Sequence, residues 1–572
     1  MHSSRRLPWA GVVLRKLFIA AALAAASALP AGAAPGAPAQ IVAQSLLMPG
    51  VTYQRAVEFT PHGPVVLDVV TAPRPDGSLY TLAPVLSNNA VVATEKLTDM
   101  EKSLSTNATV VGVNGDFFAA DPGKPTGILM RGGALDTAPA GARSSLGIGT
   151  DGTLTVAQVS FDGTWRGTGQ RRQFDLNAAP VKGHTTLYTS SWGPATPAES
   201  GVAVDVLSAI PSLLPNRVAT GVVSQVAAGG PVPIPPGGAV LVARGGQAPH
   251  LTAEAPAGTT IELRPTLTPS WNGMSGAIGG GPLLVSGGKP VFRTNESFGD
   301  PVLNKRAARS AVAQLSDGRI LLVTVEGGGS SYSAGMTNYE LAVALVRLGA
   351  RTAMGLGTGT SAAMAFDGTL LTRATEQPIA DALVLSYSGV YAAPLVSTTL
   401  SPNGDGVDDV QTFSYKLVRP SQVTATVAGP NNSTISLARD SEQPGVHTLQ
   451  WDGNGAAEGP WRFSIIATDD AGHSTTADRP FALNDTLGSL QVTANGNGVT
   501  AAFQLAHAAN VTVTVEKPNG IVVATLLSRK LDAGSQTVTW AGRPGSGYRV
   551  RVVAANSIGK ATLLSPITSR RS

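Results

Sequence analysis

Residues 320–330 read ILLVTVEGGGS and combine the two patterns that decide the fold of the larger part of this chain. The apolar and β-branched run predicts a short buried strand, and the glycine-rich turn after it begins with an acid, Glu326. Three other segments repeat this design, namely VNGDFF (113–118), AIGGGP (277–282) and GLGTGTS (355–361). Glycine lets the backbone approach a ligand closely, and neighbouring N–H groups can bind an anion. A single turn of this kind is more often structural than functional.

Helices are few and are marked by capping residues. Thr337 and Glu340 form a capping box ahead of regularly spaced leucines, and Gly349 follows as a stop. Thr98 and Glu101 predict a second, shorter helix that ends before residue 105. Because many period-two strands surround these helices, we expect an α+β mixed domain rich in strands over residues 50–392.

The first residues predict export. A basic leader precedes the apolar run 17–29, and small residues follow at 31–33, which is the layout of a secretory signal peptide. That run is too short to cross a bilayer, which needs about 20 residues. We therefore expect a signal peptide at 1–33, an Ala/Pro/Gln-rich tether at 34–49, and a secreted protein. Association of the secreted protein with the cell wall is left open. No transmembrane segment is expected after the leader is removed.

Composition narrows the function classes. The chain has 572 residues, no cysteine, 66 glycines and 40 prolines, so disulfides, thiolate metal sites and a cysteine nucleophile are excluded. The net charge is only +4, and no lysine or arginine cluster occurs beyond the leader, which disfavours nucleic acid as a partner.

The C-terminal part contains an internal repeat. VTATV (423–427) matches VTVTV (511–515), and GVHTLQW (445–451) matches GSQTVTW (534–540). Short strands repeated after about 90 residues predict two tandem immunoglobulin-like β-sandwiches, at 396–484 and 485–572.

Several ordered motifs together resemble the phosphodiester glycosidase family, which includes the enzyme that removes N-acetylglucosamine from a phosphodiester to uncover mannose 6-phosphate. They are GPV (63–65), VNGDFF (113–118), RSS (143–145), LYTSSWG (187–193), GGGPLLVSGGKPV (279–291) and ARS (308–310), followed by the capped helix and the Gly/Ser loop. The tail, beginning with SPNGDGVDD (401–409), resembles immunoglobulin-like modules of the flagellar hook-assembly (FlgD) type.

The resemblance implies hydrolysis of a sugar-1-phosphodiester, with a glycan or sugar phosphate as ligand. Such chemistry needs carboxylates for proton transfer or attack, and cations or N–H groups for the phosphate. The residues that match these roles are Asp116 and Glu326 as catalytic carboxylates, and Asn114, Arg309, Gly280, Gly359 and Ser361 as substrate-binding residues. The alternative for Asn114 and Asp116 is a hydrogen-bonded turn, and for Arg309 an ion pair at the surface. We expect the loops that carry these residues to form one pocket, with Asp116 and Arg309 facing it.

Three motifs depart from the family pattern. Where relatives read LDGGGS, VDGR and GERPV, this chain has LGTGTS (356–361), VEGG (325–328) and TEQPI (375–379). An acid and two arginines are therefore missing, which predicts weakened catalysis on an intact fold. The alternative function is a non-catalytic glycan-binding or structural surface protein displayed on the repeated modules.

No cofactor is required by these motifs, but calcium is a candidate. Asn403, Asp405 and Asp408 place oxygen ligands at alternating positions around glycines, as in a short calcium loop. The alternative is an Asx-turn at the entrance to the tail.

Overall fold

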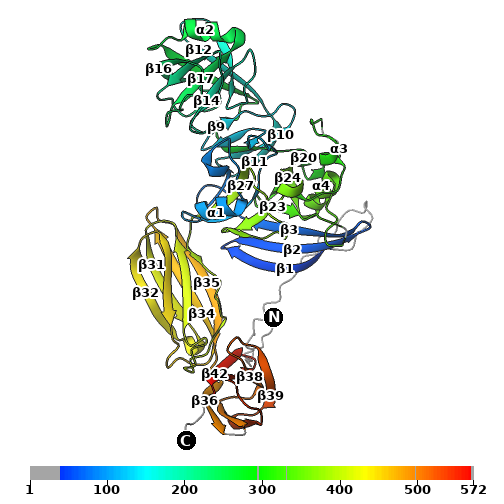
Figure 1. Ribbon diagram of the computed structural model, residues 1–572, viewed down its shortest axis with the longest axis vertical. Helices are drawn as coiled ribbons and strands as arrows, with labels where there is room; N and C mark the ends of the chain where they lie inside the picture. Colours follow the sequence, from blue (N-terminus) through cyan, green and yellow to red (C-terminus); the bar gives the residue numbers. More distant parts are fainter. Residues whose placement is uncertain (1–38, 293–294, 330, 496–497, 568–572) are drawn as a thin grey trace, which may run out of the picture.

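The computed structural model describes residues 39–292, 295–329, 331–495 and 498–567. Strands make up 52% of the chain and helices 8%, so the protein is mainly β and fits the expected α+β class only loosely. Figure 1 shows four bodies in a row: a barrel, a two-sheet body with flanking helices, and two β-sandwiches. The predicted leader, 1–33, lies outside the described residues. None of the described helices is long and apolar enough to cross a membrane.

An eight-stranded antiparallel sheet, here called sheet A, forms one layer of the two-sheet body. Its order is β1 (Gln40–Met48), β2 (Val51–Thr60), β3 (Gly63–Ala72), β23 (Ile320–Val325), β22 (Arg309–Leu315), β24 (Ala350–Gly355), β20 (Leu283–Ser286) and β21 (Lys289–Pro290). The predicted strand at 320–325 is thus confirmed as β23. The tether predicted at 34–49 is wrong over 40–48, because β1 pairs with β2 along most of its length.

A second sheet, sheet B, packs face to face on sheet A. Its order is β26 (Thr369–Leu370), β25 (Met364–Phe366), β5 (Thr109–Asn114), β27 (Asp381–Tyr387) and β4 (Tyr80–Leu86). Val312 and Leu322 of sheet A share one buried cluster with Val113 and Leu383 of sheet B. Residues next to them on sheet A, such as Val323, point the other way and pack against helix α4 (Asn338–Arg347).

The two predicted helix starts have different outcomes. Thr337 caps α4, and both hydrogen bonds of the capping box with Glu340 are present. The second box is wrong, because helix α1 (Leu97–Leu104) begins one residue before Thr98. Glu376, from a distant loop, takes the role predicted for Glu101 and accepts hydrogen bonds from Thr98 N–H and Oγ1, both at 2.8 Å.

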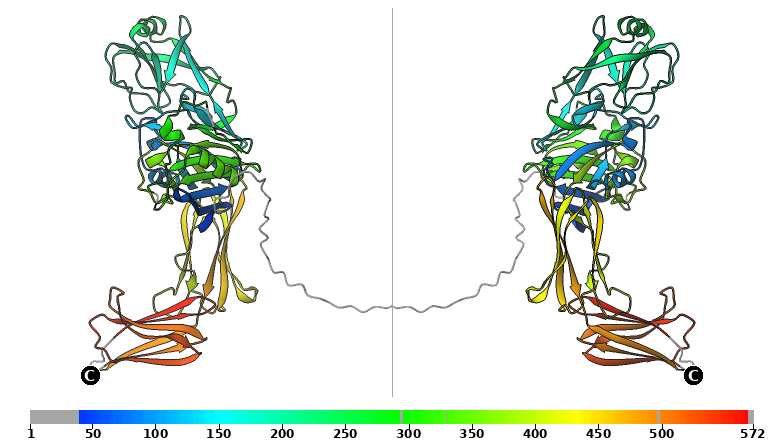
Figure 2. Two further views of the ribbon diagram at one scale, coloured as in Figure 1. Left: turned by 90° about the vertical axis from the view of Figure 1, so that its right-hand side faces the viewer. Right: turned by 90° about the vertical axis from the view of Figure 1, so that its left-hand side faces the viewer.

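A closed seven-stranded barrel is inserted into the larger part of the chain, and none of the sequence patterns predicted it. Its order is β12 (Ser160–Arg166), β13 (Arg172–Leu176), β14 (Thr185–Thr189), β17 (Ala239–Arg244), β15 (Val202–Leu207), β16 (Ala219–Ala228) and β18 (Thr260–Thr268), with α2 (Ala248–Glu254) outside. A small sheet joins it to the two-sheet body, in the order β11 (Leu154–Gln158), β10 (Ser144–Gly149), β19 (Met274–Gly279), β8 (Leu129–Arg131) and β9 (Ala134–Thr137). The chain enters the barrel after β11 and leaves it before β19. In both views of Figure 2 the barrel, coloured cyan to green, lies at the end of the molecule away from the C-terminal tail.

The connecting segments add short elements. They are β6 (Phe118–Ala119), β7 (Lys124–Pro125) and α3 (Asp300–Leu303), together with the 3₁₀ turns η1 (Ser87–Asn89), η2 (Gly245–Gln247), η3 (Gly359–Ser361) and η4 (Pro430–Asn432).

The tail consists of two β-sandwiches, each with one buried core. The first, module 1, pairs β28 (Tyr391–Ala392), β30 (Gln411–Leu417) and β33 (Gly445–Trp451) in one sheet, and β29 (Thr399–Leu400), β35 (Ser474–Leu483), β34 (Gly459–Asp469), β31 (Ser421–Ala428) and β32 (Thr434–Glu442) in the other. The second, module 2, has one sheet of β36 (Leu487–Asn495), β37 (Gly498–Leu505) and β40 (Gly534–Trp540). Its other sheet consists of β39 (Val522–Leu531), β38 (Ala509–Glu516), β41 (Arg549–Ala555) and β42 (Lys560–Pro566).

The internal repeat coincides with matching strands of the two modules. VTATV lies in β31 and VTVTV in β38, while the two Trp-terminated segments are β33 and β40. An immunoglobulin topology remains a prediction. Module 1 begins slightly before residue 396, because β28 already belongs to its sheet. It also touches the two-sheet body, where Lys416 Nζ lies 2.9 Å from Asp367 Oδ1.

Candidate active site

Three of the four glycine-rich loops meet at one edge of the two-sheet body. Gly357 N–H donates to Gly115 O at 2.8 Å, and Gly281 N–H donates to Gly355 O at 2.9 Å. The loops after β5, β19 and β24 are therefore joined backbone to backbone. Small residues are required here, because a Cβ on Gly280 would lie 2.6 Å from Gly355 O. Gly280 is thus a packing residue, and a direct role in binding substrate has no support from its surroundings.

Asp116 lies in the turn after β5 and is buried. Its Oδ1 accepts the N–H of Phe117 at 2.7 Å, and its Oδ2 accepts the N–H of Gly127 at 2.5 Å. Burial raises the pKa of Asp116 to about 6, although these two N–H groups act in the opposite direction. Both oxygens are occupied by the chain, so the carboxyl group holds two loops together.

Asp381, at the start of β27, is a second buried acid that the sequence analysis missed. Its Oδ1 accepts the backbone N–H of Asp116 at 2.9 Å, and its Oδ2 has no hydrogen-bond partner among the described residues. Burial, and then the charge of Asp116, raise the pKa of Asp381 well above its usual value. An acid in front of the apolar run 382–385 was the available signal, since a charge at the start of a buried strand needs a reason.

Both polar atoms of the Asn114 side chain are hydrogen-bonded within the protein. Its Nδ2 donates to Gly357 O at 3.0 Å, while its Oδ1 accepts Ser310 Oγ at 2.6 Å and Ala363 N–H at 3.1 Å. The amide therefore ties sheet B to sheet A and to the loop after β24. Its predicted contact with a sugar hydroxyl would require breaking one of these bonds, and the structural alternative describes it better.

Glu326 directly follows β23 and lies in a different environment. Its Oε1 accepts Arg55 Nη2 at 3.0 Å and Arg373 N–H at 2.9 Å. Its Oε2 is buried and has no partner among the residues described. Burial raises the pKa of Glu326, and the nearby charge of Asp68 adds to this effect.

Asp68, on β3, is the second carboxyl group at this position and was not anticipated. Its Oδ1 accepts Tyr53 Oη at 2.6 Å and Arg55 Nε at 2.8 Å, and its Oδ2 lacks a partner in the described part of the chain. Burial raises the pKa of Tyr53, and the hydrogen bond to Asp68 adds to it. Two carboxyl groups, each with one free oxygen, thus share a single guanidinium.

The strand register connects the two acidic pairs. Arg55 pairs with Asp68, Asp68 with Thr324, and Thr324 with Ser310, so these four residues form a polar row across sheet A. Neighbouring strands lie about 4.8 Å apart, and the row therefore spans roughly 14 Å. Because Ser310 donates to Asn114, the row continues to the turn that holds Asp116.

Two further side chains border Glu326 on the outside. The Arg373 guanidinium lies 4.4 Å from the centroid of the Tyr332 ring, which is a cation–π geometry. Arg373 is exposed and Tyr332 half-buried, whereas the Arg55 side chain is 25% exposed. A ligand that approaches Glu326 from solvent would therefore meet two arginines.

Arg309 does not belong to this arrangement, and the predicted pocket with Asp116 is wrong in this respect. It alternates with Ser310 on β22 and points to the opposite face of sheet A, where Nε donates to Met336 O at 2.9 Å. Its side chain is fully buried, and burial lowers its pKa to about 10. It is not the predicted surface ion pair either.

The remaining predicted loop residues lie near the surface. Gly359 has φ +75° and donates its N–H to Ala308 O, while Ser361 Oγ donates to Thr358 O at 3.1 Å. In the same loop, a Cβ on Gly357 would lie 2.9 Å from Asn114 Nδ2 and 3.0 Å from Asp116 O. A side chain at the position of the missing family acid would therefore be crowded against Asn114 and the turn that holds Asp116.

The predicted calcium loop has the hydrogen bonds of a turn. Asp409 accepts the N–H groups of Asn403, Gly404 and Gly406 at 2.6–2.9 Å. Asp405 Oδ1 accepts Val407 N–H at 2.8 Å, and Asp408 has φ +55°. These bonds match the Asx-turn alternative, and calcium remains a prediction.

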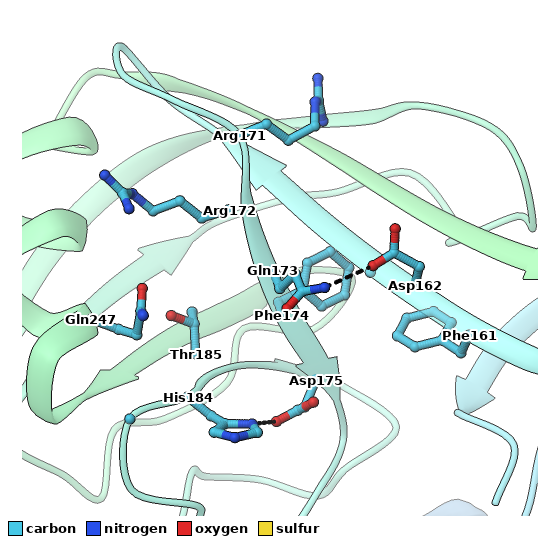
Figure 3. A pocket seen from close by; sticks show the side chains of 12 residues that line it. Phe161, Asp162, Arg171, Arg172, Gln173, Phe174, Asp175, His184, Thr185 and Gln247 are labelled. Atoms are coloured by element: carbon cyan, nitrogen blue, oxygen red, sulfur yellow. Dashed lines mark hydrogen bonds and ion pairs between the residues drawn. The ribbon is translucent and has the colours of Figure 1, made fainter. Parts of the chain in front are cut away.

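The barrel carries a polar hollow of about 370 Å³ (Figure 3). It is lined by Phe161, Asp162, Gly163, Arg171, Arg172, Gln173, Phe174, Asp175, Gly183, His184, Thr185 and Gln247. Several of its charged groups are already paired, such as Arg171 with Glu262 at 2.8 Å. Aromatic rings beside paired polar groups are compatible with a small polar ligand.

Comparisons with known proteins agree with part of this picture. Residues 216–386 match the family model described as phosphodiester glycosidase, which covers Glu326, Arg373 and Asp381 but not Asp68 or Asp116. No curated protein matches this chain.

Solved structures add a likeness of fold. A hypothetical protein from Synechocystis is 27% identical, with a TM-score of 0.50, over 59% of this chain and 62% of that chain, so this protein spans less than two thirds of its length. A putative exported protein from Burkholderia pseudomallei is 22% identical over 56% and 74%, with a TM-score of 0.46. The zebrafish N-acetylglucosamine-1-phosphodiester alpha-N-acetylglucosaminidase catalytic domain is 13% identical over 60% and 84%, with a TM-score of 0.31.

Proposed function

We propose that this protein is an exported glycosidase-type hydrolase that acts on sugar-1-phosphodiesters of extracellular or cell-wall glycans. One observation carries the proposal: the carboxyl groups of Glu326 and Asp68 share Arg55 at the end of β23, beside Arg373. Glu326 and Arg373 lie within the stretch that matches the phosphodiester glycosidase model. Export is inferred from the leader alone.

The chemistry assigns different tasks to the cations and the carboxylates. Arg373 would hold the negative phosphate, because a guanidinium binds phosphate oxygens through paired N–H groups. Arg55 would add positive charge nearby, since its Nε and Nη2 already bond Asp68 and Glu326. A water molecule would attack the sugar C1 as its bond to the phosphate oxygen breaks. The electron pair leaves with the phosphate, and the proton of the water passes to Glu326. A phosphate is a good leaving group, so a base matters more here than an acid.

The environment of Glu326 suits a base that works near neutral pH. Its pKa is raised by burial, and a base is most effective when its pKa lies close to the working pH. Because the base must be ionised, the rate should rise with pH through this raised pKa. Asp116 and Asp381 are assigned to positioning the loops, since the chain already occupies most of their oxygens.

The missing family residues bear on the rate. Gly357 and Gly328 stand where relatives have an acid and an arginine, so we expect slower turnover than in a relative with LDGGGS. Loss of one positioned acid or base costs about 10²–10⁴-fold.

A second function is favoured by the barrel. Its polar hollow, with Phe161 and Phe174 at a centroid distance of 6.0 Å, suits glycan binding without catalysis. In that case the protein would be a glycan-binding surface protein displayed on modules 1 and 2.

Turnover by the purified protein separates the two functions. A panel of sugar-1-phosphodiesters should be hydrolysed, and Glu326→Gln should lower kcat by about 10²–10⁴-fold. Glu340→Gln is the matched control, because Glu340 lies in the helix cap on another part of the surface. If no member of the panel is hydrolysed while glycans still bind, the binding function replaces the hydrolase. Equal loss in both variants would remove Glu326 from the chemistry.

A further inference from the structure

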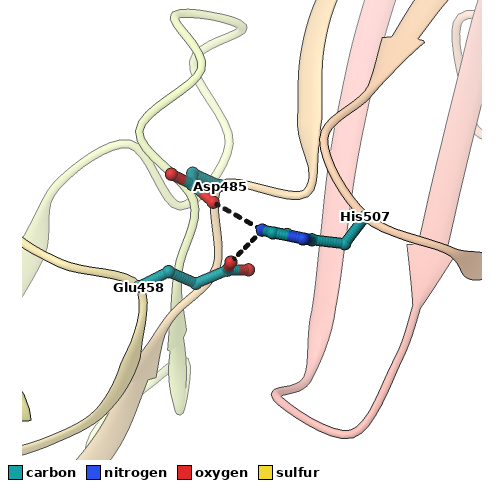
Figure 4. Close-up of side chains that lie close together, drawn as sticks. All are labelled: Glu458, Asp485 and His507. Carbon is teal, nitrogen blue, oxygen red and sulfur yellow. Dashed lines mark ion pairs between the residues drawn. The ribbon is translucent and has the colours of Figure 1, made fainter. Parts of the chain in front are cut away.

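The two tail modules meet at a joint that gathers side chains from three separate segments (Figure 4). Glu458 precedes β34 of module 1, Asp485 lies in the link between the modules, and His507 follows β37 of module 2. The metal-ligating atoms of these three residues all lie within 4.8 Å of one another. His507 Nε2 is 2.6 Å from Glu458 Oε2 and 3.9 Å from Asp485 Oδ1.

We propose that Glu458, Asp485 and His507 bind a divalent metal ion of the zinc class and thereby lock module 2 onto module 1. An imidazole nitrogen with two carboxylates is a donor set that zinc accepts, with solvent in a fourth position. Zinc bonds of about 2.0–2.2 Å place neighbouring ligand atoms roughly 3.4 Å apart. The two distances to His507 Nε2 lie on either side of that value, and all three pairs lie within 4.8 Å, so small side-chain shifts would bring the donors to zinc distance.

The surroundings hold one ligand in place. Glu458 Oε1 accepts Thr486 Oγ1 at 3.2 Å, and Thr486 Oγ1 in turn accepts Asn556 Nδ2 at 2.8 Å. This leaves Glu458 Oε2 directed at His507. Outer hydrogen bonds of this kind orient metal-binding carboxylates.

The electrostatics of the joint favour a doubly charged ion. The carboxylates of Glu458 and Asp485 both lie beside His507 Nε2, at 2.6 Å and 3.9 Å, so two negative charges are held close together. A divalent ion supplies two positive charges and can contact all three groups. His507 and Asp485 are 55% and 56% exposed, so the ion has an open path.

The joint also differs from the other histidine–carboxylate pairs. His473 lies 3.1 Å from Asp469 within one hairpin of module 1, and no third ligand completes a group there among the described residues. His473 is therefore a matched control that keeps the ion pair but lacks the metal site.

Zinc titration of the full-length mature protein, first stripped with a chelator, tests this proposal. Wild type should bind one equivalent of zinc, with an affinity at least about tenfold higher than that of His507→Gln or Asp485→Asn. His473→Gln should bind zinc like wild type. Asp485 and His507 are exposed, so these changes should leave the fold intact, and circular dichroism checks this. Small-angle scattering should show a narrower range of module orientations with zinc. If wild type and the three variants bind zinc equally, or if none of them binds zinc at about 100 micromolar, the joint is an ion pair only. Either result overturns the proposal.

Discussion

Asp68, in the middle of β3, and Glu326, just after the neighbouring strand β23, are bridged by one guanidinium, with Arg55 Nε 2.8 Å from Asp68 Oδ1 and Nη2 3.0 Å from Glu326 Oε1. Both carboxyl groups are almost completely buried, whereas the arginine side chain is a quarter exposed. A buried carboxylate is costly without a partner, so the arginine stabilises the fold as well as the site.

Arg55→Met should therefore destabilise the protein. Removing one member of a buried ion pair costs about 3–5 kcal/mol, and partial exposure of Arg55 places this case near the lower value. Arg55→Lys should cost less, because it keeps the charge while losing the bidentate geometry. Urea denaturation measures both. Arg319, an exposed arginine paired with Asp317, is the control, and Arg319→Met should change stability by under about 1 kcal/mol. Similar losses at both positions would contradict this account.

An unpaired acid in the barrel predicts a pH-dependent stability. Asp205 on β15 is fully buried, neither of its carboxyl oxygens has a partner among the described residues, and burial raises its pKa to about 7. The folded state thus holds its proton more tightly than the unfolded chain does. The stabilisation is complete below the usual pKa near 4 and is lost as the pH rises through about 7.

Asp205→Asn should remove this dependence. Its free energy of unfolding, relative to wild type, should rise between pH 4 and pH 8 by up to roughly 4 kcal/mol, since each pKa unit corresponds to about 1.4 kcal/mol. Denaturation curves at several pH values provide the measurement. Asp162→Asn is the control, because Asp162 is exposed on the same barrel. A constant difference between Asp205→Asn and wild type across this range would show that Asp205 titrates normally.

The turn at the entrance to the tail predicts a calcium response only if its carboxylates bind an ion. Asp405 Oδ2 is buried without a partner in the described structure, while Asp409 is occupied by backbone N–H groups. If the loop binds calcium, millimolar calcium should raise the melting temperature of the full chain, and Asp405→Ala should abolish the rise. His507→Gln should leave it unchanged, which separates this loop from the joint. An unaltered melting curve would leave the Asx-turn.

Local patterns in the sequence predicted local structure well. The strand 320–325, the cap at Thr337 and the repeated strands of the tail all depend on neighbours within a few residues, and each is present. The barrel was missed because its strands look like those of the surrounding sheets, and only the connections distinguish an insertion from a continuous domain.

The candidate site was predicted less completely, because it depends on register. Glu326 was found from its turn, but Asp68 and Arg55 come from strands about 260 residues away and meet it only through the order of sheet A. Arg309 was misplaced for the same reason, since a shift of one residue along β22 moves a side chain to the other face.

Gly357 provides the sharpest test of the altered motif. Its position corresponds to the acid of LDGGGS, so sequence alone suggests that restoring the acid would recover catalysis. The packing argues against this, because a Cβ there would lie 2.9 Å from Asn114 Nδ2, 3.0 Å from Asp116 O and 3.2 Å from Gly115 O. The Asn114 amide is held by its own hydrogen bonds, and the other two contacts are backbone oxygens, so little room can be made without cost.

Gly357→Asp should therefore destabilise the protein by about 1–3 kcal/mol, as overpacking does, and should not raise turnover of a sugar-1-phosphodiester. Adding Gly328→Arg and Gln377→Arg should not rescue it, because neither change relieves the contact with Asn114. Thr360→Asp, three residues further along the same loop and exposed, is the control and should keep both stability and turnover near wild type. Denaturation and steady-state kinetics on the same preparations give both readouts. If Gly357→Asp folds as stably as wild type and turns over substrate faster, the loop can move away from Asn114, and the glycine marks a lost catalytic residue that a single change restores.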